Sequence, residues 1–343
     1  MNELRRDFIK GAGVAGAVVI TGCAGRAPPA GAVAAGTGMR AKSDGPAVIP
    51  KGMTFVTMMS GGNYSLGVKT ERGILDVRKA AMGQKSSAPT TIDDLIHGGD
   101  GGLSNLVKLA VAKGDKALFL EESAIEFGPC VTNPEKILCV GLNYARHARE
   151  TNNPIPTLPI LFNKFNNALN SHQGTVRVST VPAEKFDYES ELVIVMGKKA
   201  RNVSEADALS YVFGYCNGND FTARDLQMRS SQWMIGKTCD GFGLLGPYLV
   251  TADQVNPNNL KIEGTVNGEV RQSSNTSDMV FNCAQIISYA SKLMTLEPGD
   301  IIYTGTPEGV ITGYPKEKQV WLKAGDKLTT TFAGLGTLRF TLT

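Results

Sequence analysis

The feature that most constrains this chain is an apolar strand with an acidic beginning, Phe186–Gly197. Side chains alternate between the two faces of a strand, so Glu189 and Glu191 project to the same side, about 7 Å apart along the strand. Two carboxylates on one face repel each other unless a cation or a proton lies between them. The structural alternative is a solvated edge strand, which would normally carry mixed polar residues such as lysine and threonine.

A third carboxylate follows the next apolar strand, Ser210–Cys216, because that strand runs into Asn217, Gly218, Asn219 and Asp220. The region has no paired cysteines and no clustered histidines. Three carboxylates without such ligands suit a hard divalent ion rather than zinc. We therefore expect Mg²⁺, with Mn²⁺ or Ca²⁺ as alternatives, bound by Glu189, Glu191 and Asp220.

Upstream, the apolar strand Ile137–Gly141 leads into a predicted short helix over 142–150. His147 and Glu150 are three residues apart, so they share one face of such a helix. A surface ion pair is the structural interpretation of this spacing. A hydrogen-bonded pair that activates water is the functional interpretation.

The composition favours a turn-rich domain that contains β-structure, since 343 residues include 39 glycines and 16 prolines, which are typical of many turns and short strands. Strand signals near 54–58 and 66–68 and helical spacing near 91–97 and 102–112 predict a small α+β domain over 53–130. A catalytic domain is predicted over 131–343. A net charge of +3 offers no basic stripe for nucleic acid.

The N-terminus predicts an export signal over 1–22, in which Arg5 and Arg6 precede the weakly apolar run Gly11–Gly22. That run is too short to span a bilayer, which needs about 20 residues, and the arginine pair resembles a twin-arginine signal. Cys23 closes a stretch that resembles a lipoprotein box, so it is a candidate for lipidation. The alternative is soluble cleavage after Ala34.

Residues 23–52 are predicted to be a low-complexity tether, because they are rich in alanine, glycine and proline and poor in large apolar residues. Together, the signal and the tether lead us to expect an exported protein. It would be periplasmic, or anchored to the membrane through a lipidated Cys23.

Several ordered blocks between 137 and 340 resemble the fumarylacetoacetate hydrolase family, and 66–77 is more weakly similar to the small N-terminal domain of that family. The blocks are Asn143–Tyr144 with His147 and Glu150, Asp187–Leu192, Asn219–Asp220, Ala223–Gln227, Gln232–Trp233 with Gly236–Lys237, Leu245–Pro247, Asn275–Met279, Leu296–Asp300 and Thr304–Pro307. The resemblance implies the mixed β-sandwich roll of that family, which is an α+β fold that is mostly β with peripheral helices. It also implies a homodimer.

The resemblance also implies roles for single residues. Glu189, Glu191 and Asp220 would hold the ion, which would polarise the carbonyl of a 2-oxo acid and stabilise an enolate. Lys237 would place a positive charge beside the same oxygen. His147, oriented by Glu150, would take a proton from water. Gln227 and Thr306 match positions that bind substrate, although both would also serve as turn-stabilising residues, and Trp233 is expected to be packing.

The reaction expected from this set is hydrolysis of a C–C bond in an acylpyruvate-like β-diketo acid. Decarboxylation or isomerisation of oxaloacetate-like or unsaturated 2-oxo-diacids is the alternative, and a catalytically silent 2-oxo-acid-binding lipoprotein is the alternative of another class. The chain departs from the family where Lys164 is followed by Phe165 instead of proline. We expect this difference to reshape the pocket wall, so the resemblance does not identify which 2-oxo acid is the substrate.

Overall fold

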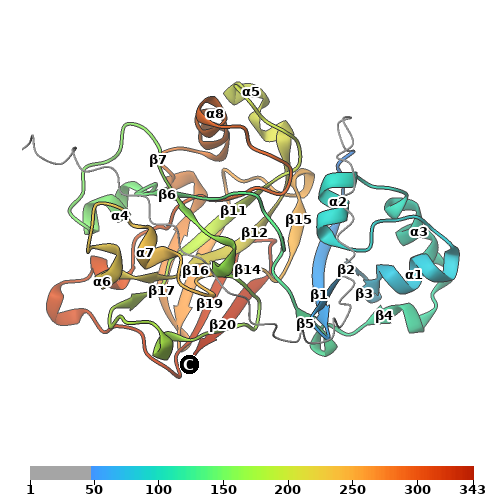
Figure 1. Ribbon diagram of the computed structural model, residues 1–343, viewed down its shortest axis with the longest axis horizontal. Coiled ribbons are helices and arrows are strands. Elements are labelled where there is room, and N and C mark those ends of the chain that lie inside the picture. The colour runs from blue at the N-terminus through green and yellow to red at the C-terminus, as the bar shows by residue number, and fades with distance from the viewer. Residues whose placement is uncertain (1–47) are drawn as a thin grey trace, which may run out of the picture. The chain divides into compact units, whose positions relative to one another are not determined.

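Strands β11 (Ser190–Met196) and β12 (Val212–Asp220) lie at the centre of the fold (Figure 1). Every residue in both strands is buried, as expected for strands whose two faces are both covered. They pair in antiparallel fashion, with Glu191 opposite Gly218. The structure is a computed structural model that describes residues 48–343, so the predicted export signal, Cys23 and most of the predicted tether lie outside the described residues.

Within the described residues, β11 and β12 belong to a mixed sheet of 13 strands with the main order β4-β3-β2-β1-β15-β12-β11-β18-β6-β7. Strands β18 and β6 pair in parallel, as do β14 and β8, and the other pairs are antiparallel. The remaining strands of this sheet are β1 (Thr54–Ser60), β2 (Asn63–Thr70), β3 (Gly73–Asp76), β4 (Phe119–Leu120), β5 (Glu126–Phe127), β6 (Ile137–Gly141), β7 (Ile160–Lys164), β8 (Leu169–Ser171), β14 (Gly243–Leu245), β15 (Leu249–Thr251) and β18 (Ile301–Tyr303).

A second sheet of five strands packs against β11 and β12 and has the order β17-β16-β19-β20-β9. Buried and more exposed residues alternate along β16, β19 and β20, because one face of this sheet covers the core. The bounds are β9 (Thr175–Val176), β16 (Lys261–Val266), β17 (Glu269–Asn275), β19 (Lys327–Phe332) and β20 (Thr337–Leu342). Two packed sheets with peripheral helices confirm the expected α+β, mostly β fold.

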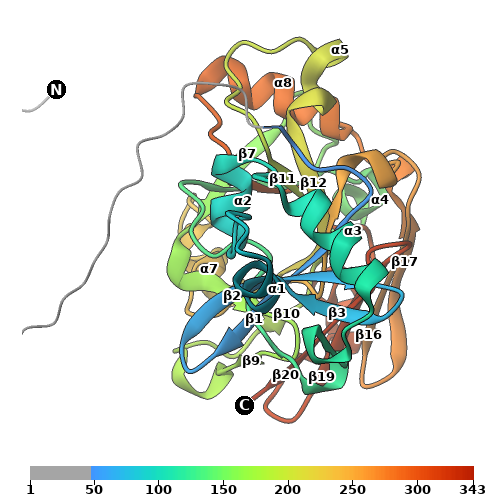
Figure 2. The same ribbon diagram turned by 90° about the vertical axis from the view of Figure 1, so that its right-hand side faces the viewer.

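The segment from 53 to 130 supplies β1 to β5 and three helices, which Figure 2 shows from their own side. Strand β1 pairs with β15 through Thr54 and Val250, so the large sheet runs without a break from this segment into the part of the chain after residue 131. The helices are α1 (Val77–Gln84), α2 (Ile92–Gly98) and α3 (Leu103–Lys113).

The later helices are short except for α8, and none in residues 48–343 is long and apolar enough to cross a membrane. They are α4 (Ala145–Glu150), α5 (Glu205–Ala208), α6 (Arg224–Gln227), α7 (Met234–Lys237) and α8 (Cys283–Leu293). Helix α4 begins three residues later than predicted, because Leu142 has a left-handed backbone (φ +54°) and Tyr144 is extended. Both residues turn the chain between β6 and α4.

Candidate active site

The three carboxylates singled out in the sequence converge at the edge of the central strands. Oxygen atoms of Glu189, Glu191 and Asp220 lie within 4.8 Å of one another, and all three residues are buried. Asp220 ends β12, and its backbone N–H donates to the Glu189 carbonyl (2.9 Å), which holds the first and third acids side by side. Oxygen ligands in this number and spacing fit a hard divalent cation.

The predicted strand over 186–197 is interrupted at Tyr188 and Glu189, so Glu189 lies outside both of the strands that flank it. The short strand β10 (Phe186–Asp187) pairs with β13 (Thr222–Ala223), whereas β11 starts only at Ser190. The Glu189 N–H donates to the side chain of Asn219 in β12 (3.2 Å) instead of to a backbone carbonyl. This break lets Glu189 and Asp187 reach different partners.

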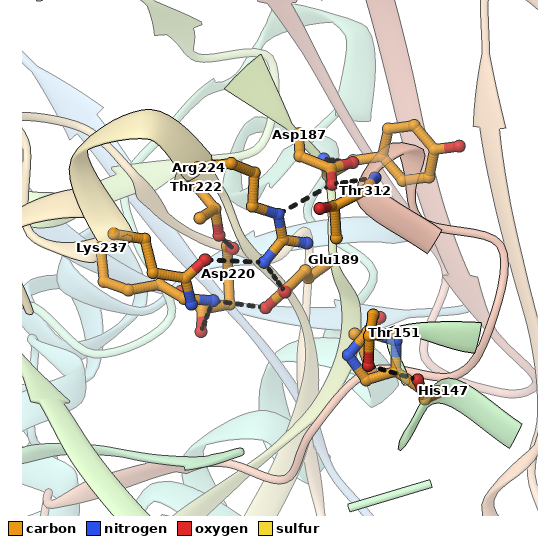
Figure 3. Close-up of polar contacts among 12 residues, drawn as sticks. His147, Thr151, Asp187, Glu189, Asp220, Thr222, Arg224, Lys237 and Thr312 are labelled. Atoms are coloured by element: carbon orange, nitrogen blue, oxygen red, sulfur yellow. Dashed lines mark hydrogen bonds and ion pairs between the residues drawn. The ribbon is translucent and has the colours of Figure 1, made fainter. Parts of the chain in front are cut away.

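Positive charges surround the cluster from three directions. Lys237 Nζ lies 2.6 Å from Glu189 Oε2 and 2.9 Å from Asp220 Oδ2, and Lys164 Nζ lies 2.5 Å from Asp220 Oδ1. Arg224 Nη1 donates to Glu189 Oε1 at 2.8 Å (Figure 3). Lys237 was predicted to lie in the site. Lys164 and Arg224 were not predicted to lie in the site. Each is a cation that directly follows a largely apolar stretch, and this signal could have identified them.

The surroundings of Glu189 and Glu191 shift the pKa values of these two carboxyls in opposite directions. Burial by itself raises the pKa of Glu189, but Lys237 and Arg224 outweigh burial and hold this pKa at about 2. Burial, followed by the charges of Asp220 and Glu189, raises the pKa of Glu191 well above its ordinary value. Burial would lower the pKa of Lys237, yet Asp220 and Glu189 outweigh it, so this ammonium stays charged.

Glu191 is the carboxylate without a cationic partner. Its Oε2 accepts a hydrogen bond from Gly305 N (2.7 Å), and no lysine or arginine among residues 48–343 forms an ion pair with it. A buried carboxylate that lacks a counter-charge is costly, and a bound cation would remove that cost. The cluster therefore fits a divalent ion better than it fits a purely structural ion-pair network.

The predicted pair on α4 is also present. His147 Nδ1 lies 2.8 Å from Glu150 Oε1, and the His147 ring is 6% exposed. The second oxygen, Glu150 Oε2, accepts from Gly309 N (2.9 Å). Because an acceptor faces Nδ1, this nitrogen carries the proton in the neutral ring and Nε2 is left as the proton acceptor.

One cavity of about 640 Å³ joins these groups. Its wall includes seven of the eight residues predicted for the site: His147, Glu150, Glu189, Glu191, Gln227, Lys237 and Thr306. Asp220 lies behind the wall, bonded to Lys237. The Gln227 side chain accepts from Arg224 Nη1 (3.1 Å), and the Thr306 hydroxyl donates to Ser190 O (3.1 Å) and accepts from Gln272 (2.8 Å).

An aromatic wall was missed by the sequence interpretation, which treated Trp233 as packing. Trp233 and Phe162 both line the cavity and meet edge to face, with ring centroids 5.5 Å apart. Gly141 makes room for the indole, since a Cβ there would come within 2.4 Å of the Trp233 ring. Phe165, which replaces the family's proline, is 52% exposed, while the preceding Lys164 points inward.

Curated proteins and solved structures resemble this chain. A mitochondrial oxaloacetate tautomerase of Bos taurus, FAHD2A, is 42% identical over 253 residues, which are 73% of this chain and 79% of that protein. A fumarylacetoacetate hydrolase from Exiguobacterium antarcticum is 29% identical with a TM-score of 0.68, covering 84% of this chain and 99% of that one. The fumarylpyruvate hydrolase of Pseudomonas aeruginosa, solved with Mn²⁺ and pyruvate, is 34% identical with a TM-score of 0.56, covering 63% and 91%.

These comparisons correct the expected location. The related oxaloacetate tautomerases of Xenopus laevis, Bos taurus and Homo sapiens are named as mitochondrial, so the prediction of an exported, periplasmic or lipid-anchored protein is wrong. The physical reason is that secretory signals and mitochondrial transit peptides both contain basic residues near the start. Arg5, Arg6 and the short apolar run therefore did not discriminate between the two destinations. These residues and Cys23 lie outside the described part of the chain.

The C-terminal part of the chain carries the family assignment. Residues 136–343 match the family model described as fumarylacetoacetate hydrolase C-terminal. This stretch contains β6, α4, the carboxylate cluster and the whole cavity wall. The match spans more than half of the chain, and the solved relatives share its fold. The chain belongs to the fumarylacetoacetate hydrolase family.

Proposed function

We propose that this protein is a divalent-metal-dependent enzyme that interconverts the keto and enol forms of an oxaloacetate-like 2-oxo acid. The observation that carries the proposal is one cavity lined by a proton-accepting dyad, His147 and Glu150, and by the carboxylates Glu189 and Glu191. The oxaloacetate tautomerase of Bos taurus, to which the chain is 42% identical, supports this choice of substrate.

Glu189, Glu191 and Asp220 would hold the ion, which when bound supplies a Lewis acid for the 2-oxo group. Mg²⁺ and Mn²⁺ both suit three carboxylate oxygens, and Ca²⁺ remains an alternative of the same class. The Mn²⁺ in the related fumarylpyruvate hydrolase makes Mn²⁺ the ion with which to begin.

His147 would carry the proton. Glu150 holds Nδ1–H at 2.8 Å, so Nε2 faces substrate as the base that removes a proton from C3 of the 2-oxo acid. Protonation of the C2 oxygen completes the enol, and the reverse transfers restore the ketone. The reaction consumes no water and breaks no C–C bond. The imidazole takes the proton from C3, and either the imidazolium or the solvent gives a proton to the C2 oxygen.

Lys237 and Arg224 would stabilise the negative charge that develops on the 2-oxo oxygen and hold the substrate carboxylate. Both cations are buried, which strengthens their fields relative to those of exposed lysines. The neighbouring carboxylates keep the pKa of Lys237 raised, so its charge persists at neutral pH. Gln227 and Thr306 line the same cavity and are proposed to orient substrate.

Hydrolysis of an acylpyruvate-like β-diketo acid is the second candidate, because the same dyad could deprotonate a water molecule instead of C3. The related fumarylpyruvate hydrolase favours this candidate. Decarboxylation of oxaloacetate is a third outcome that needs mainly an electron sink. All three reactions pass through an enolate, so the geometry of the enolate site alone does not separate them.

One panel of assays separates them. Protein loaded with Mn²⁺ is given oxaloacetate, with enol absorbance and released CO₂ followed separately, and a set of acylpyruvates, with pyruvate release as the readout. We expect rapid decay of the enol signal without matching CO₂ or pyruvate release, and loss of this activity on exhaustive chelation. Efficient pyruvate release from an acylpyruvate, with no effect on the enol absorbance of oxaloacetate, would contradict tautomerisation and support hydrolysis.

A further inference from the structure

Asp187 is a fully buried acid beside the site, and the proposed function gives it no role. Both of its oxygens are saturated by donors. Oδ1 accepts from Tyr188 N and Ile311 N, each at 2.9 Å, and Oδ2 accepts from Thr312 N (3.0 Å) and Arg224 Nε (2.8 Å). A carboxylate that meets four donors from three separate segments fixes the relative positions of those segments.

The first of these segments carries Arg224. Its guanidinium lies between two acids, with Nε on Asp187 and Nη1 on Glu189 Oε1 (Figure 3). Because a guanidinium is planar and rigid, fixing Nε also fixes the direction of Nη1. The orientation of Glu189, a candidate ion ligand, therefore depends on Asp187 through Arg224.

The second segment is the pocket loop, which we define as residues 305–315. Thr306, Thr312, Gly313, Tyr314 and Pro315 of this loop line the cavity. Asp187 accepts from the backbone of Ile311 and Thr312, and the neighbouring Tyr188 hydroxyl donates to Gly309 O (2.7 Å). The part of the cavity wall that this loop forms thus rests on the same side chain.

Glu150 has a matching arrangement. One of its oxygens meets His147 and the other meets the backbone of Gly309 in the pocket loop. Each of the two acids therefore binds one side chain of the site, Arg224 or His147, and one stretch of the same loop.

We propose that Asp187 is a positioning residue that sets Arg224 against Glu189 and simultaneously sets the pocket loop, so that the ion site and the cavity wall hold one relative position. The inference rests on the proposed function for its activity readout and on the proposed ion site for its Mn²⁺ readout, whereas amide exchange depends on neither. Its other readouts, Mn²⁺ affinity and amide exchange in the pocket loop, involve no substrate.

The test is Asp187→Asn compared with Asp300→Asn. Asparagine keeps one oxygen but turns an NH₂ toward Arg224 and Thr312 N. Asp300 is a close control, since it is also fully buried, and its Oδ2 meets one backbone N–H, Glu297 N (2.7 Å), and one cation, Lys136 Nζ (3.0 Å). Asp300 does not line the cavity.

Both variants should lose thermal stability to a similar extent. Only Asp187→Asn should weaken Mn²⁺ binding in calorimetry and lower kcat, each by about 10- to 100-fold, which is typical when a residue behind a ligand is changed. It should also speed amide exchange in 305–315. Asp300→Asn should stay within about twofold of the wild type in Mn²⁺ affinity and kcat, because such buried contacts act locally. Equal effects in the two variants would overturn the inference.

A second variant tests the path through the guanidinium. In Arg224→Lys, one amine cannot reproduce the simultaneous contacts to Asp187 and Glu189, so adding Asp187→Asn should cost little further Mn²⁺ affinity. Additive losses would contradict the proposed path. If Asp187→Asn does not fold, faster exchange of 305–315 in Arg224→Lys supports the inference, and unchanged exchange refutes it. Altered Mn²⁺ affinity in a protein that turns over no substrate would refute only the proposed function.

Discussion

Gly313 lies directly against the Glu150 carboxylate, so closely that a Cβ at this position would come within 2.4 Å of Glu150 Cδ. The same carboxylate holds His147 and the backbone of Gly309. A larger residue here would push the Glu150 carboxylate out of its position, so the geometry of the dyad depends on a residue more than 160 positions away in the chain.

Gly313→Ala should damage catalysis while leaving the fold intact. The added methyl group forces Glu150 away from His147 or from Gly309, and a displacement of about 1 Å in a catalytic group costs on the order of 10²-fold in rate. Steady-state kcat is the measurement. Gly83→Ala is the control, since Gly83 lies in α1 with nothing within 4 Å of its added methyl group, and it should raise stability slightly. Normal activity in Gly313→Ala would show that the dyad tolerates reorientation.

His147→Ala should separate the proton-transfer reactions from decarboxylation. Removal of a general base typically costs about 10²–10⁴-fold, so tautomerisation and acylpyruvate cleavage should both fall by this factor. Decarboxylation of oxaloacetate by the metal-loaded protein should be largely retained, because it needs an electron sink and no base. His97→Ala, a change far from the cavity at the end of α2, should alter none of the three rates. Equal loss in all three reactions would refute the assignment of His147 as the base.

Glu191→Gln should have opposite effects on stability with and without metal. A carboxyl whose pKa is raised by folding contributes stability below its unfolded pKa and loses it as pH rises through the folded pKa. At neutral pH the metal-free wild type therefore carries this penalty, and the metal-free variant should melt at a higher temperature. With saturating Mn²⁺ the wild type should gain more than the variant, which lacks one ligand charge.

Differential scanning calorimetry with and without Mn²⁺ measures both effects. Glu269→Gln makes the same chemical change at a mostly exposed side chain that forms a surface ion pair with Arg271, and it should shift neither melting temperature by much. A lower melting temperature for metal-free Glu191→Gln would mean that Glu191 is compensated without an ion.

His172 should make the protein sensitive to mild acid. Burial, with a smaller contribution from the charge of Arg339, lowers the pKa of His172 to about 4, and its Nδ1 accepts from Arg339 N (3.2 Å). As pH falls, His172 binds a proton near pH 6.5 in the unfolded chain but only near pH 4 in the folded chain. Stability therefore falls as pH drops through this window.

Replacing His172 with glutamine keeps an acceptor for Arg339 N but removes the titration. The free energy of urea unfolding, measured at intervals from pH 7 to pH 4, should fall less steeply in His172→Gln than in the wild type. Parallel curves for the two proteins would show that other groups cause any acid sensitivity in this range.

Local sequence patterns determined the elements and the main chemistry of the site. Three-residue spacing on a helix paired His147 with Glu150, a relationship that depends only on backbone geometry. Period-two alternation predicted that Glu189 and Glu191 share a side, and their oxygens do converge, but Glu189 lies before the start of β11, so the fold and not the alternation places it. Seven of the eight predicted residues line one cavity, and the eighth, Asp220, completes the carboxylate cluster. Gln227, Lys237 and Thr306 were predicted from the family resemblance and not from residue spacing.

The tertiary structure decided the charges around that chemistry. Lys164 meets Asp220 across 56 positions, and Asp187 meets the backbone of Ile311 and Thr312 across more than 120 positions. Such pairs depend on sheet register and on the path of loops, which no local period encodes. The sequence by itself therefore determined which side chains could bind an ion and move a proton. Only the fold decided which cations neutralise the buried carboxylates, and that within residues 48–343 no cation pairs with Glu191.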